Sequence, residues 1–336
     1  MTNELIRGAV YLPARAYNHY QQWRDYNPAE AERDLGFAAS VNLNALRLWV
    51  SYHHWLEDAA HLEASFRHFV DTAQKYGIRI LPVLFEQCGI EPTPEALVDT
   101  HPKTGMCIKS PGSSITDDSG AWGKAIDFTM WFVDKFGADA RLLAIESMNE
   151  PITVEELAFA REITQQLKQH ADLPVTLGIV GGIHSLVYYG NWDLDIFQFH
   201  MNFPASTTAM EEALREAQGY KTRTGNRPIW LTEWQRVRPS GTGWGNDALT
   251  DAELGPDLAS LAPLIHHYEI SNFFWSLMLK PAYLPPQRAK GTFNGLFHED
   301  GTVWSLADAR AVSGNPDLML EERKVLPDWF TQVNAE

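Results

Sequence analysis

The sequence predicts an α/β fold, a single (β/α)8 barrel with enlarged loops after its strands. Strand-like runs alternate with amphipathic helical stretches along the whole chain, as in a parallel sheet wrapped by helices. We count eight strand candidates and about eight helices in 336 residues, a length that suits one such barrel. Because no linker, charge run or low-complexity tract divides the chain, we expect one domain over 1–336, with the barrel at about 5–313 and a C-terminal tail at 314–336.

The strands are predicted from short runs of apolar and β-branched residues that turn signals interrupt. The fourth lies in the stretch Leu143–Pro151, which opens on apolar residues and ends at a proline that cannot donate to a ladder. The other seven are expected at Ile6–Tyr11, Ala45–Val50, Ile78–Phe85, Val175–Val180, Asp195–His200, Pro228–Trp234 and Ser271–Trp275. A doubly wound sheet that binds a dinucleotide is disfavoured, because Arg7–Val10 lacks a glycine-rich phosphate turn.

The helices are predicted from apolar residues three and four positions apart and from signals at their ends. Thr153 and Glu156 form a capping box before one helix, and Gly77 ends another. The helices are expected at Pro28–Ser40, Leu62–Tyr76, Trp122–Phe136, Val154–His170, Ala209–Tyr220, Leu254–Tyr268 and Leu306–Val312. Long irregular segments remain at Gln87–Gly120, Gln235–Asn246 and Leu277–Phe297. Loops of this length are unusual in a compact domain and tend to be functional.

The composition limits the partners and the compartment. The formal net charge of −16 argues against nucleic acid or an anionic membrane as a partner. The amino terminus lacks a basic segment followed by an apolar one, and no apolar run reaches the ~18 residues of a membrane span, so we expect a cytoplasmic protein. Cys88 and Cys107 are the two cysteines, which neither make a disulfide framework nor have metal-ligand spacing. The 12 tryptophans supply aromatic faces on which sugars stack.

Polar and aromatic side chains gather at the carboxyl ends of the predicted strands. In a closed barrel these ends surround one bowl, where barrel enzymes keep their chemistry. Glu150 and Glu233 stand at the ends of the fourth and seventh strands, so they are expected to form a carboxylate pair across the ring. The strand ends offer Tyr11, Arg47, Trp49, Glu86, Asn149, Glu150, His200, Asn202, Glu233 and Trp275.

This set suits glycoside hydrolysis, in which one carboxyl group protonates the leaving oxygen while the other attacks carbon or activates water. Arg47 could hold one carboxylate ionised, His200 would join the polar network, and Trp275 would stack on a sugar ring. Each residue also has a structural interpretation. A glutamate can interact with the dipole of the following helix, an arginine can form a structural ion pair, and a histidine or tryptophan can belong to the core. Two carboxylates at two strand ends favour catalysis over these alternatives.

Five segments at the strand ends form a recognisable set. They are Asn44–Arg47 (NALR), Leu143–Ile152 (LAIESMNEPI), Phe199-His200, Trp230–Trp234 (WLTEW) and Trp275. Together they resemble the strand motifs of clan A glycoside hydrolases, nearest to family 5, the cellulase and mannanase family. The resemblance covers the barrel at about residues 5–313, and its fourth-strand motif is the strongest part.

The resemblance implies a retaining β-glycosidase that uses no cofactor. It places the acid/base at Glu150 and the nucleophile at Glu233, with carboxyl groups roughly 5–5.5 Å apart. The implied partner is a carbohydrate, no metal ligands are expected, and the oligomeric state is left open. The substrate-binding candidates are Arg47, Trp49, Glu86, Asn149, His200, Asn202, Trp234 and Trp275.

Two positions depart from the family's pattern. Family 5 usually has His-x-Tyr on the sixth strand, where this chain has His200 and Asn202. Family 5 usually has a histidine at the end of the third strand, and we interpret Glu86 at this position as a residue that grips sugar hydroxyls. The Asn202 amide could donate to Glu233, as a tyrosine hydroxyl would, or bind the sugar. We favour sugar binding, because both changes together indicate a remodelled glycone pocket.

Other functions use similar residues. The same carboxylate pair could transfer the sugar to another acceptor, which makes a transglycosylase the closest alternative. A non-catalytic sugar-binding barrel is disfavoured because both carboxylates are present. A metal-dependent lyase or isomerase would gather Glu86, Glu150, His200 and Glu233 around a divalent cation, and a chelator would abolish its activity.

The long loops lead to two further expectations. They could wall off one side of the bowl, so we predict a pocket that acts on short soluble glycosides from one end. Two of the loops also carry cations that could recognise a carboxylate or sulfate on the sugar. Surface ion pairs with the many acidic residues are the simpler interpretation of these cations. They are Arg236, Arg238, Lys280, Arg288 and Lys290.

Overall fold

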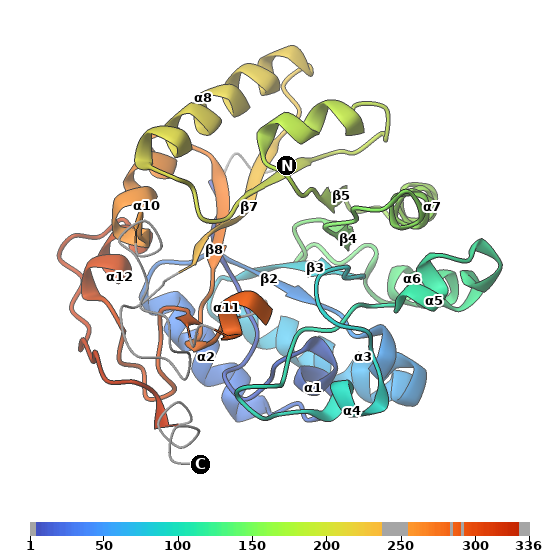
Figure 1. Cartoon of the computed structure of the whole chain (residues 1–336), viewed down its shortest axis with the longest axis horizontal. Helices are drawn as coiled ribbons and strands as arrows, with labels where there is room; N and C mark the ends of the chain where they lie inside the picture. Colours follow the sequence, from blue (N-terminus) through green and yellow to red (C-terminus); the bar gives the residue numbers. More distant parts are fainter. Residues whose placement is uncertain (1–4, 237–254, 283–284, 290–291, 329–336) are drawn as a thin grey trace.

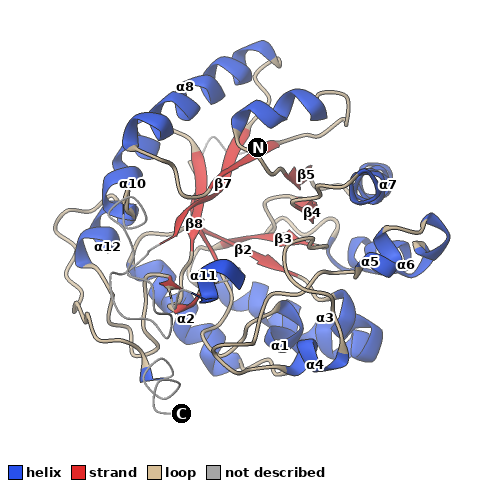
Figure 2. Cartoon of the chain, viewed as in Figure 1, coloured by secondary structure: helices blue, strands red, loops and turns tan. Residues whose placement is uncertain are grey.

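The computed structural model describes residues 5–236, 255–282, 285–289 and 292–328. Eight parallel strands form one sheet in the order β5-β4-β3-β2-β1-β8-β7-β6. Strands that follow one another in the chain are therefore paired in the sheet, except β5 and β6, which stand at the two ends of this order, and β8 pairs with β1. Helices surround the strands (Figure 1), and Figure 2 shows the two kinds of element in separate layers. The predicted (β/α)8 barrel is confirmed.

The strands lie where the apolar runs predicted them. They are β1 Arg7–Val10, β2 Ala45–Trp49, β3 Arg79–Val83, β4 Ile145–Asn149, β5 Val175–Gly178, β6 Phe197–Met201, β7 Ile229–Arg236 and β8 Ser271–Trp275. Two of them extend past the predicted carboxyl end, β6 to Met201 and β7 to Arg236. A short antiparallel pair, β9 Lys280–Pro281 and β10 Phe293–Asn294, lies within the long segment after β8.

The helices on the outside of the barrel match the predicted order. Those of eight residues or more are α2 Pro28–Ser40, α3 Tyr52–Lys75, α6 Gly123–Phe136, α7 Val154–His170, α8 Thr207–Arg223, α10 Leu258–His267 and α12 Leu306–Ser313. Shorter helices occupy the loops on the carboxyl side of the strands. They are α1 His19–Arg24, α4 Pro94–Val98, α5 Ser113–Thr116, η1 Ser119–Ala121, η2 Ile183–Tyr189 and α11 Pro285–Ala289. None of the helices in the described ranges is long and apolar enough to cross a membrane.

The largest difference from the predicted helices concerns α3, which begins at Tyr52, ten residues before the predicted Leu62. Ser51 caps this start by accepting a hydrogen bond from the backbone N–H of His54. The backbone at Asp58 is not helical, with φ −149° and ψ 82°, so a kink separates two helical segments. The apolar period restarts after the kink, and for this reason the pattern predicts only the second segment.

Side chains of the strands alternate between the barrel interior and the layer beneath the helices. On β2, Ala45 belongs to the interior cluster, while Leu46 and Leu48 belong to the larger outer core. The interior is tightly filled, since a Cβ built on Gly8 would come within 2.4 Å of the Phe273 ring. A packed interior leaves the carboxyl ends of the strands as the place where polar side chains can meet.

Candidate active site

A bulge in β7 turns Glu233 into the barrel. Phe199 pairs with Leu231 and His200 pairs with Glu233, so Thr232 is an extra residue on β7. Bulges re-aim side chains next to active sites. Here both Thr232 and Glu233 bond to polar groups inside the barrel. Glu233, the predicted nucleophile, therefore reaches the bowl because of the bulge. The regular alternation of side chains along a strand would not predict this.

Two aromatic residues expected at the strand ends face away from the bowl. Trp234, a predicted substrate-binding residue, is 1% exposed and packs in the outer core. Its Nε1 donates to Asn272 Oδ1 at 3.0 Å, so the prediction for Trp234 is wrong. Tyr11 also belongs to the outer core, and its hydroxyl donates to Asp34 Oδ2 at 3.0 Å. Both rings face the helices rather than the bowl.

Glu150 reaches the bowl through an unusual backbone conformation. It follows Asn149 at the end of β4 and has a φ of 47°, in the left-handed region that non-glycine residues seldom adopt. The neighbouring strands hold this conformation. The N–H of Asn149 donates to Phe85 O at 2.8 Å, and the N–H of Glu150 donates to Gly178 O at 2.9 Å. Two successive polar side chains can therefore face the site, and such strained positions cluster at functional sites.

Arg47 on β2 is the centre of the polar network. It is 0% exposed, and its Nε and Nη2 donate to the two oxygens of Glu146 at 2.8 and 2.5 Å. Its Nη1 donates to Glu233 Oε1 at 2.8 Å, and its Nη2 also donates to Asn149 Oδ1 at 2.7 Å. Burial by itself lowers the pKa of Arg47, but Glu146 and Glu233 outweigh burial and raise it. The guanidinium therefore stays charged and holds residues of β4 and β7 together.

Glu146 is a site residue that the sequence analysis did not select. It lies inside the apolar run of β4, is 0% exposed, and also accepts from Gln198 Nε2 at 3.1 Å. The packing of the Glu146 side chain against β5 explains why residue 178 of that strand is a glycine. A Cβ built on Gly178 would lie 2.4 Å from Glu146 Oε1 and 2.9 Å from Asn149 Oδ1. A charged residue within a buried strand was the available signal, because such a residue needs a buried partner.

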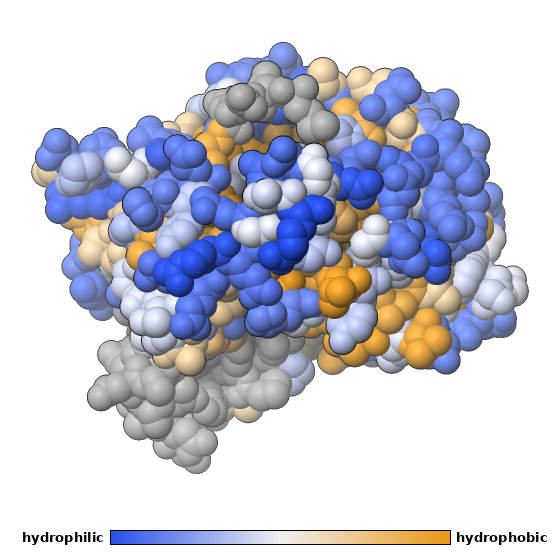
Figure 3. Space-filling view, turned by 90° about the horizontal axis from the view of Figure 1, so that it is seen from above, coloured by the Kyte–Doolittle hydropathy of each residue, from blue (hydrophilic) through white to orange (hydrophobic). Residues whose placement is uncertain are grey.

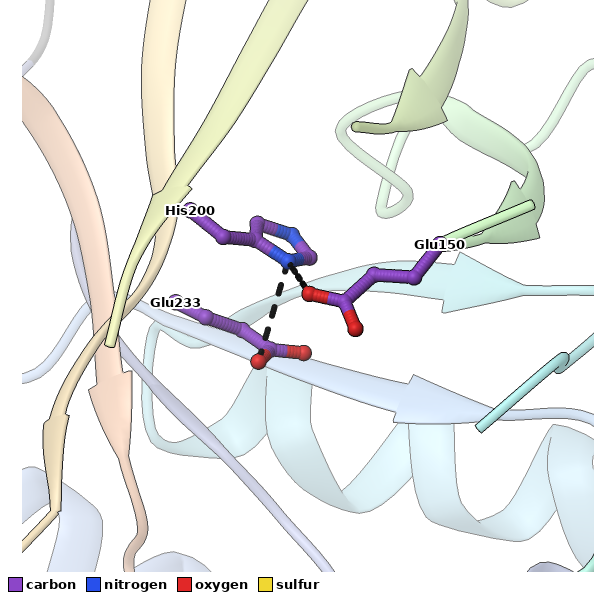
Figure 4. Close-up of side chains that lie close together, drawn as sticks. All are labelled: Glu150, His200 and Glu233. Atoms are coloured by element: carbon purple, nitrogen blue, oxygen red, sulfur yellow. Dashed lines mark hydrogen bonds and ion pairs between the residues drawn. The ribbon is translucent and has the colours of Figure 1, made fainter. Parts of the chain in front are cut away.

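The predicted acid/base lies beside His200. Figure 4 shows Glu150 extending from β4 toward His200 and Glu233. Its Oε1 is 2.5 Å from His200 Nδ1, which in turn is 3.7 Å from Glu233 Oε2. Burial lowers the pKa of His200, but the charges of Glu233 and Glu150 more than compensate, so that its pKa is raised. His200 therefore tends to carry a proton between the two carboxyl groups.

Cys88 also contacts the predicted acid/base. Its thiol donates to Glu150 Oε2 at 2.8 Å. Burial, together with the charges of Glu86 and Glu150, raises the pKa of the Cys88 thiol well above its usual range, so the sulfur keeps its proton and remains a donor. Sequence reasoning missed this contact because a lone cysteine in a long loop carries no signal.

Asn202 is placed against the predicted nucleophile. Its Nδ2 donates to Glu233 Oε2 at 2.8 Å, so both oxygens of Glu233 accept from fixed donors, Asn202 and Arg47. The sequence analysis favoured sugar binding, and the observed contact instead favours the alternative in which Asn202 supports Glu233. A role in binding the sugar stays a prediction.

Glu86 is buried next to Asn149 and accepts a hydrogen bond from its side chain. It is 0% exposed and accepts from Asn149 Nδ2 at 2.9 Å and from the N–H of Cys88 at 2.6 Å. Burial raises the pKa of Glu86 well above its usual range, although the two donors partly oppose this effect. Glu86 therefore orients Asn149 in this structure, and its contact with sugar hydroxyls stays a prediction.

Trp49 and Trp275 lie next to each other on the opposite side of the site from α8. Their ring centroids are 6.1 Å apart in an edge-to-face arrangement, and Arg47 lies over the Trp49 ring at 5.0 Å. Both rings line a small cavity of about 20 Å³, together with His19. This is where the structure places the two aromatic candidates for sugar binding.

The predicted cations have other roles where the structure describes them. Lys280 Nζ donates to Pro13 O at 3.1 Å and Ala16 O at 2.5 Å, and burial lowers the pKa of Lys280 to about 7. Arg288 donates to Pro102 O and Gly105 O at 2.7 and 2.6 Å. Both side chains are buried, so they are not surface cations in this structure, and a role in anion recognition stays a prediction.

The other cations predicted on these loops lie largely outside the described residues. Arg238 and Lys290 lie in undescribed segments, and so does most of Gln235–Asn246. Arg236 is the last residue of β7, and its side chain is not described.

One group of possible metal ligands occurs among the described residues. It consists of Glu150, His200 and Glu233, whose ligand atoms lie within 4.8 Å of one another. The two oxygens of Glu233 already accept from Arg47 and Asn202, and His200 tends to carry a proton. A metal ion would have to displace these hydrogen bonds and the proton of His200, whereas the contacts as they stand suit proton transfer between the three groups.

The comparisons with known proteins support the fold. No protein-family model matches the sequence, and no curated protein is significantly similar to it. Among solved structures, the exo-β-1,4-mannosidase Op5Man5 from Opitutaceae bacterium strain TAV5 matches with a TM-score of 0.63 and 14% identity over 93% of this chain. The chain spans 59% of the length of that mannosidase.

Two further solved structures match this chain over more than nine-tenths of its length. The hyperthermostable endo-1,4-β-D-mannanase from Thermotoga petrophila RKU-1 has a TM-score of 0.62 and 10% identity, with 93% of this chain and 99% of the mannanase covered. GH5_18 from Streptomyces cattleya has a TM-score of 0.62 and 12% identity, with 95% and 83% covered. The chain therefore shares the barrel fold of these three enzymes, as its pattern of strands and helices predicted.

The buried pair of Arg47 and Glu146 leads to a stability prediction. Glu146→Ala leaves part of a buried guanidinium unpaired, so we expect the free energy of unfolding to fall by about 3–5 kcal/mol in urea denaturation. Glu63→Ala is the matched control, because it removes the partly exposed partner of Arg67 and should cost about 0–1 kcal/mol. Equal losses in the two variants would contradict the central role of Arg47.

Proposed function

We propose that this protein is a retaining β-glycosidase, with Glu233 as the nucleophile and Glu150 as the acid and then the base. The proposal rests on one observation. A carboxylate oxygen of Glu150 and one of Glu233 lie within 4.8 Å of each other, at the ends of β4 and β7. Retaining glycosidases hold their carboxyl groups about 5–5.5 Å apart, whereas inverting ones need about 6.5–9.5 Å to admit a water molecule. The short separation supports retention.

The surroundings of the two carboxyl groups differ in the way this mechanism requires. Glu233 accepts from Arg47 and Asn202, and donors of this kind favour the ionised form that attacks carbon. Glu150 meets the Nδ1 of His200 and the thiol of Cys88, which can share a proton with it. Glu233 is therefore fixed by two donors, and Glu150 lies beside groups that can exchange a proton with it.

The reaction follows from these roles. A Glu233 oxygen would form a bond to the anomeric carbon while the bond to the leaving oxygen breaks and the Glu150 proton moves to that oxygen. In the second step Glu150 would take a proton from water, whose oxygen attacks the anomeric carbon and releases Glu233. If a sugar hydroxyl replaces that water, the same residues perform transglycosylation.

We further propose that the enzyme acts on short glycosides from one end. Lys280 and Arg288 tie the segment after β8 to carbonyl groups in the segments after β1 and β3. These ties lie on the side of Trp49 and Trp275, where the small cavity also includes Lys280. A glycone subsite closed in this way supports a pocket rather than an open cleft.

The first test concerns the carboxylate pair. Glu233→Ala should abolish turnover. Glu150→Ala should lower kcat by about 10²–10⁴-fold on poor leaving groups but keep measurable activity on chromogenic β-glycosides whose leaving group needs no protonation. Glu155 provides the control. It is exposed in the first turn of α7, five residues after Glu150, and Glu155→Ala should leave activity unchanged. NMR should show that the first sugar released keeps its anomeric configuration, and inversion would rule out the retaining assignment.

A second test decides the role of Asn202. If its amide supports Glu233, Asn202→Ala should cost about 1.5–3 kcal/mol of transition-state stabilisation, seen mainly in kcat. The ionised nucleophile loses a donor, so the acidic limb of the kcat/KM profile should move to higher pH. A raised KM with an unmoved acidic limb would instead assign Asn202 to the sugar.

The third test separates action at chain ends from internal cleavage. With a soluble β-linked polysaccharide, a pocket enzyme should release reducing sugar while the viscosity of the solution hardly changes. An early fall in viscosity, before much reducing sugar appears, would show internal cleavage and contradict the closed glycone side.

A further inference from the structure

An open pocket borders the predicted acid/base on the side of α8. It is lined by the carboxyl ends of β5 and β6, the start of η2 and one face of α8, and it has a volume of about 610 Å³. This size is within the range of small-ligand sites. We call it the α8 pocket and define it by Glu150, Gly182, His200, Asn202, Glu212 and Glu216.

The α8 pocket lies on the leaving-group side of the scissile bond if the proposed function is correct. The general acid protonates the leaving oxygen, so a pocket that Glu150 borders is the one that receives the leaving group. Trp49 and Trp275 line a different cavity, which does not include Glu150. The two cavities are therefore separate, and the one that borders Glu150 is the one that can receive the leaving group.

The charge of the α8 pocket is negative. Glu212 and Glu216 are four residues apart on α8, so they share one face of the helix, and both line the pocket. Glu216 pairs with the exposed His184 at 3.1 Å, and Glu212 makes no ion pair with any residue that the structure describes. No lysine or arginine is among the residues found to line the pocket. The surface above α8 is mostly hydrophilic (Figure 3).

Two buried polar atoms beside the carboxylates lack partners within the described part of the chain. They are His200 Nε2 and Asn202 Oδ1, and both residues line the pocket. His200 is 5% exposed, and its Nε2 lies on the ring edge that faces away from Glu233 (Figure 4). Asn202 Oδ1 can only accept, so a ligand that donates a hydrogen bond would satisfy it. The unmet acceptor on Asn202 and the negative lining both indicate a ligand that donates hydrogen bonds. A protonated His200 would offer its Nε2–H to an acceptor on the same ligand, such as a hydroxyl oxygen.

We propose that the α8 pocket is a leaving-group subsite that selects glycosides whose leaving group carries an amine, such as an amino sugar. This inference rests on the proposed function, because it needs Glu150 to be the general acid. An ammonium group donates up to three hydrogen bonds and is attracted by Glu212 and Glu216. A leaving group with a carboxylate or phosphate would be repelled by the same two residues.

The test uses three aryl β-glycosides with one glycone and leaving groups of similar size. The phenyl ring carries an aminomethyl, a hydroxymethyl or a carboxymethyl group, and β-glucosides and β-mannosides are both prepared. Each partly exposed carboxylate contributes a factor of roughly 2–5 to the discrimination, so kcat/KM for the amine should exceed that for the carboxylate by about 10-fold. The hydroxymethyl substrate should fall between them.

Variants of α8 show whether the pocket causes the preference. Glu212→Gln should reduce the ratio of kcat/KM for the amine substrate to kcat/KM for the carboxylate substrate. The double change with Glu216→Gln should bring this ratio close to one. Glu211→Gln is the matched control, because Glu211 lies on the same helix but pairs with Arg215 and does not line the pocket. This variant has the same net charge as Glu212→Gln and should keep the preference. If Glu211→Gln lowers the ratio as much as Glu212→Gln does, the subsite is refuted.

Measuring the binding of the substrates, apart from their hydrolysis, tests the subsite separately from the glycosidase activity. Glu233→Ala should bind the amine substrate more tightly than the carboxylate substrate by a similar factor in calorimetry, without turnover. Hydrolysis of the hydroxymethyl substrate with no preference among the three would leave the glycosidase in place and refute the subsite. Preferential binding of the amine with no hydrolysis of any of the three by the unaltered protein would refute the glycosidase and, with it, the leaving-group role, and would leave only an amine-binding pocket.

Discussion

A single buried cation, Arg47, is the constraint on which the site depends. Moving a guanidinium out of water costs several kcal/mol, and only well-placed anions recover that cost. Glu146 and Glu233 provide them from β4 and β7, two strands that lie on different sides of β2 in the sheet order. The network is complete only when β2, β4 and β7 have all taken their places in the sheet.

This arrangement also separates the roles of the two carboxyl groups. Arg47 and Asn202 occupy both oxygens of Glu233, whereas Glu150 shares its contacts with His200 and a thiol. Each group reaches its place through a backbone irregularity, a bulge in β7 and a positive φ at Glu150. Regular strands would turn every second side chain away from the bowl, so the irregularities are needed to bring neighbouring polar residues into it.

The loops give the site two unlike sides. Toward Trp49 and Trp275, the buried side chains of Lys280 and Arg288 donate to backbone carbonyls of other loops. Toward α8 the site is open and lined by carboxylates. The overall charge of −16 does not distinguish these sides, because it counts residues without their positions. Selectivity in such a site depends on local charge at short range, where screening by salt is weakest.

The sequence by itself determined the barrel, the positions of its strands, and the placement of Glu150, Glu233 and Arg47 at strand ends. Periodicity and strand-end motifs carry this information because they are local in the chain. Only the tertiary structure decided that Glu146 neutralises Arg47, that Trp234 faces the helices, and that Lys280 and Arg288 bind carbonyl groups. The physical reason is that these outcomes depend on which strand lies opposite, on the bulge in β7 and on which backbone carbonyls a neighbouring loop brings within reach. None of these is a property of the nearby sequence.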